Sequence, residues 1–115
     1  MVVHHVASAA PGNLRSAFGL SRERMARLVD VSAKTIERWE ASASPPAGRV
    51  ARQRWTVLQQ IASVGLLVYT PAGFQAFLTT PLPTLEGRTP LQTIEAGRER
   101  EVFAALVADY EGLGS

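Results

Sequence analysis

The 115-residue chain contains no cysteine, which excludes a disulfide framework and any metal site built from thiolates. Its two histidines, His4 and His5, are adjacent, and no third ligand follows at a useful spacing, so we predict no metal site. Long hydrophobic runs are also missing, because the apolar stretch at 61–69 is too short to cross a bilayer. The start of the chain lacks the basic and apolar regions of a signal peptide. We therefore expect a soluble cytoplasmic protein with no membrane partner.

Sequence motifs of common enzymes are absent as well. The chain has no GxSxG element, no glycine-rich phosphate loop, no HExxH pair and no cysteine nucleophile. Both histidines lie close to the N-terminus, so a serine–histidine pair would require that segment to fold back over the protein. We predict that the chain is not an enzyme and holds no cofactor.

Charged residues are few, and their signs are unevenly distributed. The chain is 19% charged and 46% hydrophobic, which suits one compact domain or two very small subdomains that share a core. Residues 1–55 carry a net charge of +5, whereas residues 56–115 carry −3. The basic half favours a polyanionic partner, and the acidic half favours a different one. A protein whose charges are merely solvated is the alternative.

The first half of the sequence has the pattern of three short helices. We predict a loose arm over residues 1–12, followed by Asn13 as the cap of a helix over 14–18. Ser21 is expected to cap a second helix and Ser32 a third, with a tight turn between the two. Two short helices joined in this way are typical of a helix-turn-helix.

The second half is also expected to be helical. Prolines in the linker at 42–48 end the third helix, and a long apolar helix follows over about 49–69. Thr70 and Thr89 each precede a proline, which is a typical helix start. A final helix is predicted over about 98–111, and we find no convincing β-strand.

The predicted fold class is therefore all-α, with an N-terminal helix-turn-helix bundle, a long connecting helix and a small C-terminal helical domain. We expect three parts along the chain: a loose arm at 1–12, a helix-turn-helix unit at 13–48 and a helical unit at 49–115. Trp39 and Trp55 are expected to lie in the core or in an interface, because no cofactor motif surrounds them.

The stretch LSRERMARLVDVSAKTIERWE resembles the helix-turn-helix of Xre-type regulators. The matching positions are Leu20-Ser21, Ala26, Val31-Ser32, Thr35-Ile36 and Trp39-Glu40. Two positions depart from the common pattern: Arg22 replaces a frequent glutamine, and Asp30 replaces a frequent glycine. Because aspartate tolerates the left-handed conformation, we expect the turn to form.

A second stretch, FLTTPLPTLEGRTPLQTI, is similar to the C-terminal domain of antitoxins in the Xre/MbcA/ParS group. The matching positions are Phe77-Leu78, Thr80-Pro81, Leu85, the block GRTPL at 87–91, and Ile94. The resemblance implies an antitoxin that binds and neutralises a RES-domain toxin, which attacks NAD⁺ or transfers ADP-ribose from it. It also implies repression of the operon through operator DNA, by a homodimer or a larger assembly with the toxin.

In a helix-turn-helix, the third helix enters the major groove with its N-terminus first. We therefore expect DNA contacts from its polar positions and from the start of the second helix: Arg22, Ser32, Lys34, Thr35 and Arg38. The alternative is a helical corner retained for packing or dimerisation. The three arginines at the start of the long helix, Arg49, Arg52 and Arg54, are interpreted as its solvated face rather than as phosphate contacts.

The expected toxin contacts lie in the second half. Arg88 either stabilises the turn at Gly87, by bonding carbonyls or pairing with an acid of the last helix, or contacts the toxin; we favour the structural role. The closing segment, Asp109, Tyr110, Glu111, Gly112 and Leu113, either covers the toxin's NAD⁺ pocket or is a frayed terminus. Two other functions stay open: a stand-alone Xre-like repressor without a toxin, and an interaction module that no longer reads DNA.

Overall fold

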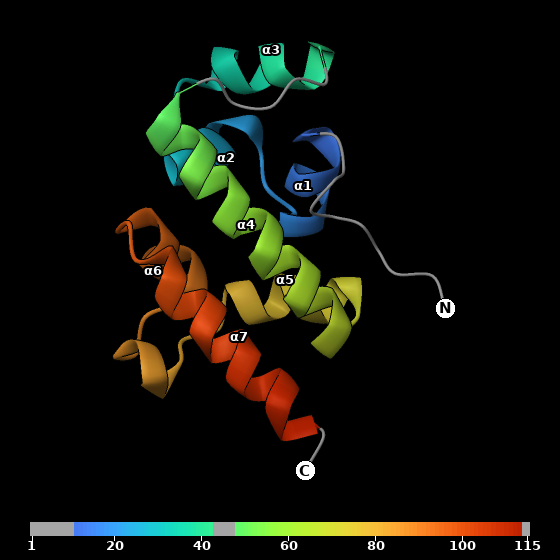
Figure 1. The fold of residues 1–115 in the computed structure, drawn as a ribbon, viewed down its shortest axis with the longest axis vertical. Coiled ribbons are helices and arrows are strands. Elements are labelled where there is room, and N and C mark those ends of the chain that lie inside the picture. Colours follow the sequence, from blue (N-terminus) through green and yellow to red (C-terminus); the bar gives the residue numbers. More distant parts are fainter. Residues whose placement is uncertain (1–10, 43–47, 114–115) are drawn as a thin grey trace.

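The computed structural model describes residues 11–42 and 48–113, and it confirms the predicted all-α fold (Figure 1). Within these residues there is no strand beyond one isolated bridge between Leu82 and Arg88. The helices are α1 (Pro11–Phe18), α2 (Arg22–Val29), α3 (Ala33–Ser42), α4 (Arg49–Val68), α5 (Pro71–Leu78), the 3-10 helix η2 (Pro83–Leu85), α6 (Pro90–Glu95) and α7 (Glu99–Leu113). In this part of the chain, no helix has the length and apolar character needed to cross a membrane. His4 and His5 lie outside the described residues, as do most of the predicted arm and linker.

The predicted helix starts are confirmed by their hydrogen bonds. The side chain of Ser21 accepts from the backbone N–H of Arg24 at 3.1 Å, and that of Thr70 accepts from Gly73 at 3.0 Å. Thr89 and Gln92 form a reciprocal capping box, with distances of 3.0 and 2.9 Å. These caps satisfy N–H groups that the first helical turn leaves without partners.

The turn between α2 and α3 has the predicted left-handed residue. Asp30 has φ 59° and ψ 50°, and its backbone N–H donates to the carbonyl of Ala26. The first helix differs from the prediction. It begins at Pro11, so Asn13 lies inside the helix rather than capping it. Proline suits this position because its fixed φ is helical and its missing N–H would have no partner.

Helix α4 is the centre of the molecule. It contacts α1, α2, α5 and α7, and in Figure 1 it runs diagonally beneath α3 with α7 alongside. Trp55 on α4 meets Trp39 on α3 edge to face, with ring centroids 5.6 Å apart. Both tryptophans are buried, as predicted. A single apolar cluster extends from α1 to α7, so the first three helices and the C-terminal helices pack on the same long helix.

The GRTPL block forms a tight loop before α6. The backbone N–H of Leu82 donates to the carbonyl of Arg88, and the N–H of Gly87 donates back to Leu82. Gly87 has φ +79°, as expected, and Glu86 also lies in the left-handed region with φ 60°. Leu85 anchors the loop in the core, so the loop is held in one shape.

Candidate functional site

The outer face of α3 presents two cations. Lys34 and Arg38 are both exposed, whereas Ile36 and Trp39 on the opposite side of the helix are buried. Neither cation takes part in an ion pair with any other described residue. Their charge is therefore available to a ligand in front of α3.

Ser32 and Thr35 have a local role at the start of α3. The hydroxyl of Ser32 accepts from the backbone N–H of Thr35 at 3.1 Å, and the two hydroxyl oxygens lie 2.9 Å apart. Ser32 is exposed and Thr35 is half-buried. Both residues lie on the predicted DNA face, and the side chain of Ser32 also caps the helix.

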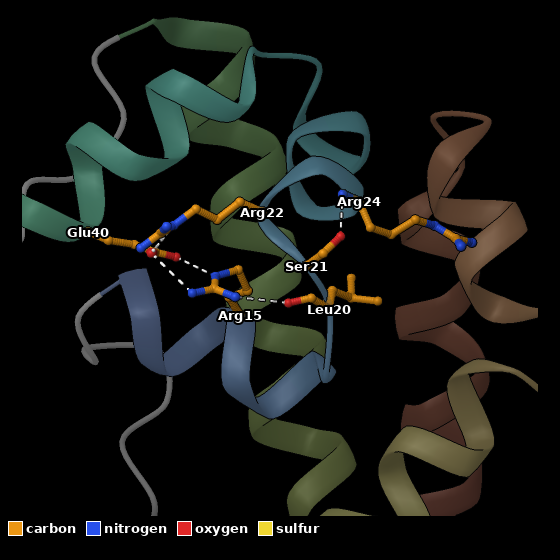
Figure 2. A network of polar contacts seen from close by, with 6 residues as sticks. All are labelled: Arg15, Leu20, Ser21, Arg22, Arg24 and Glu40. Atoms are coloured by element: carbon orange, nitrogen blue, oxygen red, sulfur yellow. Dashed lines mark hydrogen bonds and ion pairs between the residues drawn. The ribbon is translucent and has the colours of Figure 1, made fainter.

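Arg22 is part of a cluster that the sequence reasoning did not anticipate (Figure 2). Glu40, near the end of α3, accepts from Arg15 Nε at 2.5 Å and from Arg22 Nε at 2.9 Å. Arg15 also donates to the carbonyl of Leu20 at 3.1 Å. One carboxylate therefore joins α1, the start of α2 and α3, and it fixes how α3 lies on the other two helices.

The electrostatics of this Arg15–Glu40–Arg22 cluster follow from its geometry. The hydrogen bond from Arg15 lowers the pKa of Glu40; burial opposes the shift, and Arg22 adds to it. The Glu40 side chain is only 10% exposed, whereas that of Arg22 is 44% exposed. Two guanidiniums and one carboxylate leave a charge of +1. Arg22 still presents positive charge to solvent, beside the N-terminus of α2, where an anion is favoured.

A second polar cluster connects α2 to α6 and α4. Glu95 on α6 forms ion pairs with Arg24 at 2.9 Å and with Arg27 at 3.7 Å. Arg54 of α4 is half-buried and donates to the carbonyl of Leu28 at 3.4 Å. The prediction of a solvated face is therefore wrong for Arg54, although Arg49 and Arg52 are exposed. Arg54 satisfies a carbonyl in the last turn of α2, which lacks an intrahelical partner.

The side chain of Arg88 does not have the structural role that we favoured. The turn at Gly87 is closed by main-chain bonds, in which Arg88 takes part with its backbone only. The acid on the loop, Glu86, pairs with Arg98 at 3.4 Å. Arg88 itself is exposed and pairs with no acid among the described residues.

The closing segment continues the last helix as far as Leu113. Residues 109–112 are all exposed, and Asp109 accepts from the Tyr69 hydroxyl at 3.4 Å. Burial raises the pKa of Tyr69, and the charge of Asp109 adds to this. The described residues up to Leu113 thus form an exposed helix end that carries Asp109 and Glu111. It lies at the opposite end of the molecule from α3 (Figure 1), and Arg88 belongs to a separate element.

Comparison with known proteins supports one family. The chain is 28% identical over 113 residues to the mycobacterial cidal antitoxin MbcA of Mycobacterium tuberculosis strain H37Rv and to that of Mycobacterium bovis, with 98% of each chain covered. Its fold matches a chain in the crystal structure of the M. tuberculosis MbcT-MbcA toxin-antitoxin complex with a TM-score of 0.73. That match has 26% identity over 91% of this chain and 94% of the other. In sequence and in fold, the chain is similar to the antitoxin MbcA. No family model matches it.

The sequence match to MbcA covers 98% of this chain and therefore includes both stretches that carry the resemblances, 20–40 and 77–94. What sequence reasoning missed are the acids that organise the surface, Glu40 and Glu95. Glu40 is 25 residues from Arg15, and Glu95 is 71 residues from Arg24. No periodicity connects residues so far apart, so only the fold reveals these pairs.

Proposed function

We propose that this chain neutralises a RES-domain toxin that consumes NAD⁺, by binding it directly, and that it represses its own operon through the helix-turn-helix. The observation that carries the first part is the likeness to MbcA over nearly the whole chain, including a structure solved as a toxin–antitoxin complex. The second part is supported by the exposed cations on α3, beside a turn and caps of helix-turn-helix form.

The geometry favours a division of labour between the two ends of the molecule. DNA is expected at α3, through Lys34 and Arg38, with Arg22 near a phosphate. The toxin is expected at the acidic end of α7 and at Arg88. Carboxylates at an exposed helix end fit a pocket that otherwise binds phosphate groups, because such a pocket is lined by cationic donors.

Neutralisation is tested by co-expressing the chain with the product of the adjacent gene. We expect the neighbour alone to stop growth and deplete NAD⁺, and the full chain to prevent both in a complex that co-purifies. A chain that ends after Ala108 keeps the buried Val102 and Leu106 but loses the acidic end of α7. We expect this truncated chain to lose protection.

Circular dichroism of the truncated chain serves as the control for folding. Full protection by the folded truncated chain would contradict the placement of the toxin at the end of α7. A neighbour that is harmless and does not co-purify would contradict the antitoxin function itself and leave a stand-alone repressor.

DNA binding is tested with a double variant, Lys34→Ala/Arg38→Ala. We expect its affinity for the promoter DNA of its operon to fall by at least about 30-fold if both cations contact base edges, since each such contact typically contributes about 1–3 kcal/mol. The slope of log affinity against log salt should become less steep by about 2 if both cations contact phosphates. Fluorescence anisotropy over a salt series measures both quantities.

Arg88→Ala is the matched control, because Arg88 is also an exposed cation but lies away from α3. We expect this variant to bind DNA normally, and the α3 double variant to protect fully against the toxin. Loss of both functions in the folded double variant would contradict the proposed division of labour.

A further inference from the structure

Two acids near the end of α7, Asp109 and Glu111, differ in what surrounds them. Asp109 accepts a hydrogen bond from the hydroxyl of Tyr69 at 3.4 Å. Glu111 is exposed and forms no ion pair with any other described residue. The two acids at the proposed toxin-binding end are therefore not equivalent.

The geometry of the helix directs the two acids to opposite sides. Residues two apart on an α-helix point about 200° away from each other, since each residue turns by about 100°. Val102 and Leu106 on α7 are buried, and Asp109 follows Leu106 at the next helical step of three. Asp109 thus lies on the side of α7 that faces the rest of the protein, where it meets Tyr69. Glu111 therefore points away from the body of the molecule.

Tyr69 is supported by a row of aromatic rings. It directly follows α4, and its backbone N–H donates to the carbonyl of Gly65 at 2.8 Å. Its ring stacks on Phe77 of α5, with centroids 5.3 Å apart. Phe77 stacks in turn on Phe74 at 6.4 Å, and Phe74 meets Phe18 of α1 edge to face. These three phenylalanines are buried, so the core holds the ring of Tyr69 in a fixed place.

The last part of α7 has little such support of its own. No side chain of residues 107–112 is buried, so little apolar packing holds this segment. Helix ends open easily where buried contacts are few. A hydrogen bond to a charged acceptor is stronger than one to a neutral acceptor. The bond from Tyr69 to Asp109 therefore restricts a segment that would otherwise fray.

We propose that Tyr69 is a positioning residue for toxin binding, because it anchors Asp109 and thereby presents Glu111 outward to the toxin. The inference rests on the proposed function and divides the roles of the two acids: Asp109 is the anchor, and Glu111 is the contact. A toxin pocket lined by cationic groups pairs with the acid that has no partner in its own chain. An end of α7 that is ordered before binding raises the affinity, because less conformational entropy is lost in the complex.

Hydrogen exchange of the isolated full chain tests the anchor. Tyr69→Phe keeps the stacked ring and removes only the hydroxyl. We expect the protection of the backbone amides of residues 109–112 to fall by about 5-fold, the factor that one ordinary hydrogen bond contributes. The Tm should not change measurably, because the end of α7 opens without the core. Asp109→Asn is the matched variant. Its amide oxygen still accepts from the Tyr69 hydroxyl, so it should keep most of the protection.

Binding kinetics with the product of the adjacent gene test the role in toxin binding. For Tyr69→Phe we expect the association rate constant to fall by about 5-fold and the dissociation rate constant to stay the same, because a smaller fraction of the chain has the competent end. The salt dependence of association should not change, since no charge is removed. Glu111→Gln should lower both the affinity and the salt dependence, because it removes a charge that faces the toxin.

A double-variant cycle separates the anchor from the contact. We expect Asp109→Ala to weaken toxin binding in the native chain and to have no further effect in Tyr69→Phe. Additive losses would overturn the proposal, because Asp109 would then contact the toxin itself. Native association and native amide protection in Tyr69→Phe would overturn it as well. A native chain that does not bind the product of the adjacent gene would contradict the proposed function instead, and hydrogen exchange would still show whether Tyr69 anchors α7.

Discussion

Replacing Gly65 with alanine should lower the stability of this protein by about 3 kcal/mol, at the upper end of the usual cost of overpacking a core. A Cβ atom at Gly65 would lie 2.3 and 2.4 Å from two ring carbons of Phe74. That ring is fully buried and packs edge to face on Phe18 at 5.6 Å, so it has no free space to enter. The clash must outweigh the gain of about 1 kcal/mol that alanine brings to a helix interior. Thermal unfolding should show a fall in Tm of roughly 10–15 °C.

Gly112→Ala is the matched control for this substitution. Gly112 also lies within a helix, but a Cβ atom there would meet no atom within 4 Å. We expect stability to be unchanged or slightly raised. A double variant, Gly65→Ala/Phe74→Leu, removes the clashing ring carbons and should be more stable than the sum of its single variants predicts. Strict additivity of the two changes would show that the ring is not the cause.

Gly65 also shows which features of the fold could be predicted from the sequence and which could not. Its place on the apolar side of the long helix could be predicted, because the stripe repeats with helical spacing. Its close approach to Phe74 could not, because that contact joins two helices whose crossing is decided by the whole core. Likewise, the caps at Ser21, Thr70 and Thr89 could be predicted, because each depends on residues within one helical turn.

In the candidate site, too, some features could be predicted from the sequence and others could not. The exposure of Lys34 and Arg38 follows from the helical period, because Ile36 and Trp39 mark the buried side of α3. The helical period does not predict the partner of Arg22, because Glu40 reaches Arg22 only once α3 has packed across α2. The structural role predicted for the Arg88 side chain was wrong for the same reason. Main-chain hydrogen bonds close the loop, and no local sequence pattern shows that the side chain takes no part in it.

Glu40→Gln should lower the free energy of unfolding by about 2 kcal/mol at neutral pH, because hydrogen bonds to charged groups typically contribute about 1.5–3 kcal/mol. A neutral amide keeps the shape of the side chain but leaves Arg15 and Arg22 close together without a compensating charge. Urea unfolding at pH 7 measures the loss. A variant that removes both members of the closest pair, Arg15→Met/Glu40→Met, should lose less than the sum of its single changes, because Arg15 is not left without its partner and only the more exposed Arg22 is.

The difference in free energy of unfolding between the native chain and Glu40→Gln should depend on pH. This dependence tests whether the charge of Glu40 causes the difference. Folding lowers the pKa of Glu40 from its ordinary value of 4.5. A carboxyl group with a lowered pKa contributes stability that is fully present above its unfolded pKa and is lost as the pH falls through its folded pKa. The advantage of the native chain over Glu40→Gln should therefore be constant from pH 7 to about 5 and shrink as the pH falls below about 4.5. An advantage that stays the same down to pH 3 would mean that Glu40 acts through its shape and hydrogen bonds rather than its charge.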